Sequence, residues 1–224
     1  MAMASTSSAD KRPTDDDGPK QPQKKFFRSR AHSNVLNAND FWFPATPDDV
    51  PVESYFPGRA GEKIRFVDVG CGFGSLCISL AKTFPRELIL GIEIRPKLVE
   101  YVQKRALALR HETATSAAPA VAAGPAPLYD NVWAVHNNAM RFMPNFFAKG
   151  QLEKIFICFP DPHFKRKNHR KRIISQPLLA EFAYTLAPGA VLYIITDVAE
   201  LMEWMVAHLT VSPLFDRLPR EVYR

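Results

Sequence analysis

Short apolar runs and helix-patterned segments alternate along residues 64–209, and no other feature of this sequence restricts the fold as strongly. Five short apolar runs are predicted as strands, and they span residues 64–70, 87–94, 131–137, 153–159 and 190–197. The fourth is uniformly apolar, as a buried parallel strand is. Apolar residues recur with helical spacing in four further segments, at residues 75–84, 96–110, 177–187 and 199–209. This alternation predicts an α/β fold, with a mostly parallel sheet and helices on both of its faces.

Each predicted strand ends beside a polar side chain. These strand-end residues are Asp68, Glu93, Asn137, Asp161 and Asp197. In a parallel sheet the carboxyl ends of the strands share one edge, where ligands of α/β proteins bind. The sequence therefore predicts a ligand site at that edge.

A glycine-rich turn, "DVGCGFGS", follows the first predicted strand. Gly70, Gly72 and Gly74 allow positive φ angles and close approach of a ligand, although a tight turn alone would also explain them. Glu93 lies 23 residues after Gly70, where a carboxylate can accept hydrogen bonds from a ribose diol. Ser75 occupies the third glycine position of a dinucleotide fingerprint, which disfavours the alternative of an NAD-dependent oxidoreductase. The pattern resembles motif I of class I methyltransferases and predicts S-adenosylmethionine as the cofactor.

A basic cluster follows the fourth predicted strand and the tripeptide Pro160-Asp161-Pro162. The two prolines restrict the backbone around the carboxylate. The chain carries a net charge of +6, and part of that excess is concentrated in Lys165, Arg166, Lys167, Arg170, Lys171 and Arg172. Such a run either binds the phosphates of a polyanion or is a solvated face.

Several classes of protein are disfavoured by composition. The three cysteines, Cys71, Cys77 and Cys158, form no C-x-x-C pair, which argues against a disulfide framework and a zinc site. His163 and His169 lack a further cluster of ligands, so no metal is predicted. No apolar run is long enough to cross a bilayer, and residues 1–10 lack a signal-peptide core. We expect a soluble protein from a reducing compartment.

Two polar segments flank or interrupt the predicted domain. Residues 1–28 are predicted to be a disordered basic tail, and residues 29–224 the folded domain. Within that domain, residues 112–130 are rich in Ala and Pro and predict a surface loop. Ser33 follows two arginines at a spacing that basophilic kinases favour.

Five stretches resemble the catalytic subunit of eukaryotic tRNA (guanine-N7)-methyltransferase. They are "RAHSN", "DVGCGFG", "LILGIEIRPKLVEYVQKR", "NAMRFMPNFFAKGQLEKIFICFPDPHFKRKNHRKRIIS" and "LLAEFAYTLAPG...YIITD". The resemblance implies a Rossmann-like class I methyltransferase that methylates N7 of a guanine in the tRNA variable loop. It also implies tRNA and a WD40-repeat subunit as partners, and a nuclear location. A non-catalytic subunit that binds S-adenosylmethionine and RNA is the alternative.

The same resemblance assigns roles to individual residues. It implies contacts with the methyl donor at Gly70, Glu93, Ile94, Arg95, Asn138, Ala139 and Cys158. It makes Asp161 the catalytic acid. Because guanine N7 carries a lone pair and no proton, we assign Asp161 an orienting and electrostatic role rather than that of a general base. Phe159, His163 and Phe164 are candidates for stacking on the base, with packing favoured for Phe159.

The family pattern continues beyond the last residue of this chain. It has two further strands and a T-x-x-E element that contacts the donor, whereas the sequence predicts five strands. We therefore expect a sheet without its C-terminal strands and with an unpaired edge.

Overall fold

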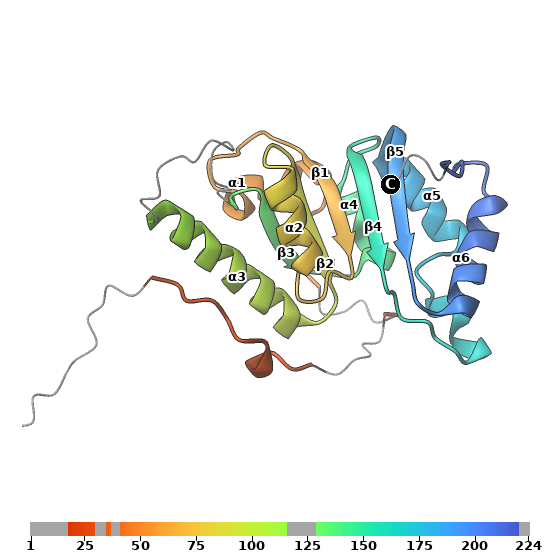
Figure 1. Cartoon of the computed structure of the whole chain (residues 1–224). Coiled ribbons are helices and arrows are strands. Elements are labelled where there is room, and N and C mark those ends of the chain that lie inside the picture. Colours follow the sequence, from red (N-terminus) through yellow and green to blue (C-terminus); the bar gives the residue numbers. More distant parts are fainter. Residues whose placement is uncertain (1–17, 30–34, 37–40, 116–128, 220–224) are drawn as a thin grey trace, which may run out of the picture.

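A parallel five-stranded sheet forms the centre of the molecule (Figure 1). The computed structural model describes residues 18–29, 35–36, 41–115 and 129–219. The strand order is β3-β2-β1-β4-β5, and every neighbouring pair is parallel. The strands are β1 (Ile64–Val69), β2 (Leu88–Glu93), β3 (Val132–His136), β4 (Leu152–Cys158) and β5 (Leu186–Ile195). The predicted α/β class and parallel sheet are confirmed.

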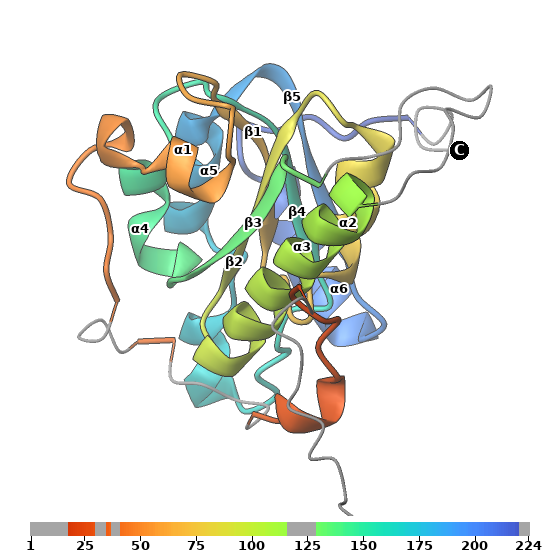
Figure 2. The ribbon, with the colours of Figure 1, turned by 90° about the vertical axis from the view of Figure 1, so that its left-hand side faces the viewer.

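Helices cover both faces of this sheet, as predicted. One face carries α2 (Ser75–Thr83) and α3 (Pro96–Thr115), which bury their apolar sides against β1, β2 and β3. The opposite face carries α1 (Val52–Tyr55), α4 (Ala139–Phe146), α5 (Gln176–Thr185) and α6 (Ala199–Thr210). Figure 2 shows α2 and α3 across the sheet from α4 and α5. The central strands are therefore buried on both faces, which explains their uniformly apolar sequences.

Strand β5 differs from the central strands. It begins at Leu186, earlier than the predicted start at residue 190, and most of its residues are only half-buried. Its pairing with β4 shifts register between Leu152 and Lys154, so the early part of the strand lies outside the regular ladder. Both β3 and β5 lie at an edge of the sheet, but β3 is mostly buried, so edge position alone does not account for the weak burial of β5.

Several helical segments depart from the predictions, among them α1 and the short 3-10 helix η2 (Pro47–Asp49), neither of which was predicted. Helix α3 runs to Thr115, so residues 112–115 are helical rather than part of a loop; residues 116–128 lie outside the described residues. Helix α4 was not predicted, because Pro144 lies inside it and it spans only eight residues. The 3-10 helix η3 (Arg166–Lys171) was also not predicted, and it contains most of the basic cluster.

The N-terminal segment is only partly the tail that the sequence predicts. Residues 18–29 are described and include a short 3-10 helix, η1 (Lys24–Phe26). The Phe27 ring meets Tyr101 of α3 edge-on at 5.4 Å, and Lys104 Nζ lies 5.4 Å from the Phe27 ring centroid. The expectation of disorder is therefore corrected for residues 18–28, because Phe27 finds an aromatic and a cationic partner on α3. Residues 1–17 and Ser33 lie outside the described residues.

The strand order places a crevice between β1 and β4. The chain proceeds outward from β1 through β2 to β3, and then returns to place β4 against the other side of β1. Such a reversal opens a crevice at the carboxyl ends of the two central strands. Within the described part of the chain, no helix has the length and apolar character needed to cross a membrane.

Candidate functional site

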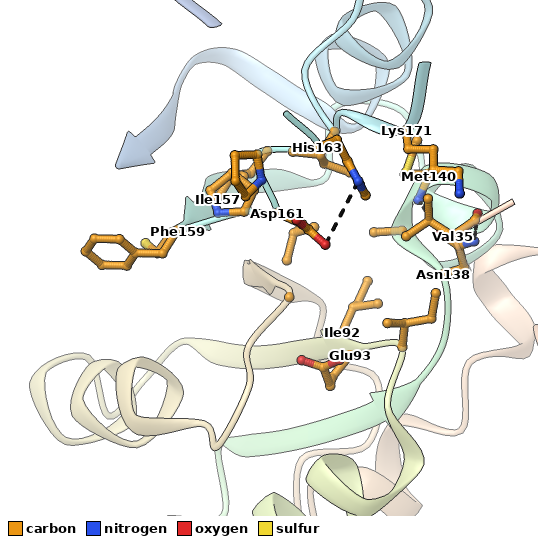
Figure 3. Close-up of a pocket in the computed structure, with 18 of the residues that line it drawn as sticks. Val35, Ile92, Glu93, Asn138, Met140, Ile157, Phe159, Asp161, His163 and Lys171 are labelled. Atoms are coloured by element: carbon orange, nitrogen blue, oxygen red, sulfur yellow. Dashed lines mark hydrogen bonds and ion pairs between the residues drawn. The ribbon is translucent and has the colours of Figure 1, made fainter. Parts of the chain in front are cut away.

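A cavity of about 390 Å³ occupies this crevice (Figure 3). Its walls come from the ends of β1, β2, β4 and β5 and from the start of α4. All residues predicted for the cofactor and for catalysis line it, namely Gly70, Glu93, Ile94, Arg95, Asn138, Ala139, Cys158 and Asp161. Residues up to 91 positions apart in the sequence thus surround one space, and whether they bind a methyl donor remains a prediction.

The glycine turn between β1 and α2 uses its glycines in two ways. Gly70, Gly72 and Gly74 have φ angles of 76°, 55° and 66°, a region that disfavours other residues. A Cβ atom built on Gly74 would lie 2.7 Å from Cγ1 of Val102, so this glycine allows α2 to approach α3. A Cβ atom on Gly70 would meet nothing within 4 Å. Gly70 therefore leaves backbone exposed to the cavity, where a ligand can approach closely.

Glu93 connects this turn to the end of β2. Its side chain is 2% exposed. One carboxylate oxygen, Oε2, accepts hydrogen bonds from the backbone N–H of Gly72 and from Nη2 of Arg95, both at 3.0 Å. The other oxygen, Oε1, accepts from the Arg95 backbone N–H at 2.9 Å and from Arg95 Nε at 3.0 Å. Four donors therefore satisfy this buried charge, and they hold the glycine turn against β2.

Asp68 lies behind the turn and does not line the cavity. Burial raises its pKa to about 6, and the nearby charge of Glu93 acts in the same direction. The Cys77 thiol donates to Oδ2 of Asp68 at 3.3 Å, which opposes the shift in pKa. The hydrogen bond with Cys71 and burial raise the pKa of the Cys77 thiol, and Cys71, Cys77 and Cys158 are all free. The two buried thiols at this turn are therefore unreactive packing residues.

Two asparagines at the end of β3 connect the cavity to the N-terminal part of the chain. Asn138 caps α4, accepting from the Met140 N–H at 3.0 Å, and its Nδ2 donates to Val35 O at 2.6 Å. Asn137 Nδ2 donates to Trp42 O at 2.7 Å. Val35 consequently lines the cavity, although sequence analysis did not predict it. Hydrogen bonds to backbone carbonyls have no sequence signature, so no pattern identifies Val35.

Asp161 lies on a constrained loop after β4. Phe159 and His163 have φ angles of 53° and 47°, an unfavourable region for residues other than glycine. The Phe159 N–H donates to Ile195 O at 2.7 Å, which holds the start of the loop against β5. Asp161 and His163 lie across the cavity from Ile92 and Glu93, with His163 Nδ1 4.0 Å from Oδ2 of Asp161 (Figure 3). The carboxylate is thereby held over the cavity by the backbone on both sides.

The three aromatic residues near Asp161 have different surroundings. His163 is largely buried and lines the cavity. Phe159 is 64% exposed and points away from Asp161 (Figure 3), so the expectation that it packs in the protein is wrong. Phe164 is 66% exposed. Both phenylalanine rings are accessible to a large partner.

The basic cluster divides into three environments. Lys165, Arg166, Lys167 and Arg170 are exposed. Lys171 is half-buried and lines the cavity. Arg172 is 2% exposed and donates to Pro162 O and to Glu200. The prediction that Arg172 binds RNA phosphates is therefore corrected, because its guanidinium is already enclosed by protein groups.

A second carboxylate, Asp197, also lines the cavity. It follows β5 as Asp161 follows β4, and sequence analysis identified it as a strand-end residue without assigning it to the site. The signal that could have found it is this equivalent position after the neighbouring strand. Among the described residues, no group of three or more His, Cys, Asp or Glu side chains is arranged to hold a metal ion.

Comparisons with known proteins agree with this geometry. The model of a family described as "Putative methyltransferase" matches residues 62–223. A Yarrowia lipolytica protein named tRNA (guanine-N(7)-)-methyltransferase is 45% identical over 203 residues, which cover 90% of this chain and 66% of that protein. Proteins of the same name are 46% identical in Oryza sativa subsp. japonica, covering 90% of this chain and 78% of theirs, and in Drosophila yakuba, covering 89% and 75%.

The matches include the glycine turn, the Asp161 loop and the basic cluster within residues 62–223. They confirm the resemblance that the five sequence stretches carry. Both the family model and the relatives extend over most of the chain, and so we conclude that the chain belongs to the tRNA (guanine-N(7)-)-methyltransferase family.

Proposed function

We propose that this protein transfers a methyl group from S-adenosylmethionine to N7 of a guanine in the variable loop of tRNA. The observation that carries this proposal is the single cavity in which the glycine turn, Glu93 and Asp161 meet, with exposed cations nearby on η3. The names of relatives at 45–46% identity support the choice of tRNA and of guanine N7.

The residues of the cavity fit an adenosine-containing methyl donor. The exposed backbone at Gly70 leaves room for close approach, and Glu93 provides acceptors suited to a ribose diol. Because four donors already occupy Glu93, the diol would replace the side-chain donors of Arg95. Ile94, Asn138 and Ala139 supply an apolar wall and amide groups for the purine. When bound, S-adenosylmethionine supplies an electrophilic methyl group on a sulfonium that leaves as a neutral thioether.

Asp161 would orient the guanine rather than remove a proton from it. N7 attacks through an in-plane lone pair, so the reaction requires alignment more than a base. The Asp161 carboxylate can accept hydrogen bonds from guanine N1–H and from the exocyclic amine. Its negative charge also lies near the purine as that ring becomes cationic on methylation. The constrained backbone at Phe159 and His163 keeps this acceptor in one direction.

The exposed cations of η3 and its N-cap residue would hold the RNA. Lys165, Arg166, Lys167 and Arg170 present four positive charges beside the loop that carries Asp161. Contacts of this type bind phosphates without reading base sequence. Lys171 faces the cavity itself and is placed to bind a phosphate adjacent to the target nucleotide.

A WD40-repeat subunit and a nuclear location complete the proposal. Both rest on the family resemblance of the sequence. We expect the protein to form a heterodimer with this subunit and to require it for efficient binding of tRNA. Co-purification of the two chains, and imaging of a fluorescent fusion of this chain in cells, test these two parts separately.

The decisive experiment measures transfer of labelled methyl groups from S-adenosylmethionine to tRNA, with and without the WD40 subunit, and maps the modified base. We expect label at N7 of a variable-loop guanine. If the protein binds S-adenosylmethionine and tRNA but transfers no label in either condition, the alternative of a non-catalytic subunit is correct. Label at another atom or in another loop would contradict the assigned substrate.

A further inference from the structure

Arg172 makes a set of contacts that no other residue of the basic cluster shares. Its Nε donates to the backbone carbonyl of Pro162 at 2.9 Å, and its Nη2 donates to Oε1 of Glu200 at 2.6 Å. Its Cζ lies 4.8 Å from the centroid of the Trp204 ring. A planar guanidinium can satisfy a carbonyl, a carboxylate and an aromatic face together, whereas an ammonium cannot.

The carbonyl that Arg172 binds belongs to the residue directly after Asp161. The following residue, His163, has a φ angle of 47°, and Phe159 on the other side of the loop has a φ angle of 53°. Backbone in this region persists only where surrounding groups hold it. A hydrogen bond to Ile195 O holds the Phe159 side, and the Arg172 guanidinium holds the Pro162 side. Asp161 lies between these two attachments.

The partners of Arg172 are themselves held in place by α6 and the segment before α5. Trp204 Nε1 donates to Ile174 O at 2.8 Å. The His208 ring stacks on the Trp204 ring, with the two ring centroids 4.2 Å apart. Glu200 and Trp204 both belong to α6. Arg172 therefore connects the Asp161 loop to a helix on the face of the sheet, and it does so at the end of η3, directly after the cavity-lining Lys171.

We propose that Arg172 is a positioning residue for methyl transfer, which fixes the Asp161 carboxylate in the direction that guanine requires. This inference rests on the proposed function, because it assumes that Asp161 contacts the base. Without the guanidinium, the Pro162 carbonyl loses its donor and the loop relaxes toward ordinary backbone angles. The consequence falls on the rate of the bound complex, since neither the residues predicted to bind the donor nor the four exposed cations change.

The test is Arg172→Lys in the full chain with its partner subunit, assayed with S-adenosylmethionine and tRNA. Rates are expressed per S-adenosylmethionine-binding site measured by calorimetry, so unfolded protein does not contribute. We expect kcat to fall about tenfold or more, while KM for tRNA and Kd for S-adenosylmethionine change by less than about twofold. We also expect ethylguanidine to restore part of the rate to Arg172→Ala, which a general loss of stability would not permit.

Arg110→Lys is the matched control. Arg110 donates through Nε to Tyr129 O at 2.8 Å and through Nη2 to Tyr55 O and Val132 O, and its Cζ lies 5.2 Å from the Trp133 ring centroid. Like Arg172, it donates to backbone carbonyls and lies against a tryptophan ring, with a third carbonyl in place of the carboxylate of Glu200. None of its partners lines the cavity, whereas Pro162, the partner of Arg172, does. We expect Arg110→Lys to lower Tm and to leave kcat per binding site unchanged.

The outcomes that overturn the inference are distinguishable from one another. A kcat per binding site in Arg172→Lys equal to that of the wild type overturns the inference alone, as does an equal fall in kcat in Arg110→Lys. Absence of methyl transfer by the wild-type complex overturns the proposed function and the inference together. If both Arg172 variants fail to fold, Glu200→Gln replaces them, since its half-exposed side chain tolerates the change; unchanged kcat in that variant then overturns the inference.

Discussion

The two sides of the cavity are built in different ways. We call the side on which we propose that the methyl donor binds the donor side. It is formed by the glycine turn and Glu93, and Glu93 is buried and held by contacts between adjacent strand ends. We call the side on which we propose that the methyl-accepting guanine binds the acceptor side. It is formed by the Asp161 loop and η3, is more exposed, and is held by groups from β5 and α6. The comparison suggests that changes on the donor side affect folding and cofactor binding together, whereas changes on the acceptor side affect catalysis and RNA binding with little effect on stability.

Asp161→Ala should give the largest effect and the clearest separation of the two sides. We expect kcat to fall about 10²- to 10³-fold, because the variant loses the acceptor that orients the base. Kd for S-adenosylmethionine and Tm should stay nearly constant, as measured by calorimetry and thermal melting. Asp48→Ala is the control, since Asp48 is an exposed carboxylate that does not line this cavity. Wild-type turnover in Asp161→Ala would show that the acceptor side does not depend on this carboxylate.

Gly74→Ala should have the opposite profile. The new methyl group would lie 2.7 Å from Val102, and the backbone at this position has a φ angle of 66°, which disfavours alanine. We therefore expect the free energy of unfolding to fall by about 3 kcal/mol. Affinity for S-adenosylmethionine should fall with it, because the same turn borders the cavity. Gly61→Ala has a similar φ angle and no neighbouring atom within 4 Å, and it should cost about 1 kcal/mol. Equal losses in the two variants would contradict the packing role of Gly74.

Asp68→Asn tests whether the donor side carries a buried charge that opposes folding. The folded pKa of Asp68 is raised to about 6 from an ordinary value of 3.8. Between these values the folded state binds more protons than the unfolded state, so its contribution to stability falls as pH rises from about 4 to about 6. We expect Asp68→Asn to match the wild type near pH 4 and to exceed it by about 2 kcal/mol at pH 7.5. Denaturant unfolding from pH 4 to pH 7.5 measures the difference in stability between Asp68→Asn and the wild type. A difference that does not change with pH would show that the buried charge of Asp68 does not oppose folding.

The smallest effect should come from neutralising Lys165, Arg166 and Lys167 together. Loss of up to three phosphate contacts should reduce the slope of log affinity for tRNA against log salt concentration by about 2, with kcat at saturating tRNA unchanged. Alanine substitution of three exposed lysines that do not line the cavity, Lys63, Lys82 and Lys149, provides a control of equal charge. If both triple variants lower the slope equally, the cluster contributes only through net charge.

The same division explains what sequence could predict. On the donor side, the glycine turn and Glu93 are adjacent to strands with strong apolar patterns, so local signals located both the fold and the residues. On the acceptor side, Asp161 was found because it follows a strand and lies in a family motif. Its neighbours were harder to predict: six cations in eight residues look alike in sequence, and only the position of Trp204 and Glu200 separates Arg172 from the others.

Elements held by distant partners were also missed. Helix α4 depends on the Asn138 cap and on packing of Met143 and Phe146, whereas its internal proline and short length obscure the helical pattern. Val35 reaches the cavity through a bond from a residue 103 positions away. The early start of β5 depends on pairing with Leu152 rather than on its own residues, which include Pro188 and Gly189. Each of these features is decided by tertiary contacts that a single sequence does not display.

The full hydrogen bonding of Glu93 has a consequence for ligand selection. The Glu93 carboxylate already accepts four hydrogen bonds, so an incoming molecule must compete with the Arg95 guanidinium for its oxygens. A ligand that offers one hydroxyl group would replace two charged donors with a single neutral one and would lose in the exchange. A vicinal diol offers two donors at once and frees the Arg95 guanidinium to contact water or another anion. We therefore propose that, if Glu93 binds the diol of the methyl donor, its four resident donors favour a ribose over a deoxyribose.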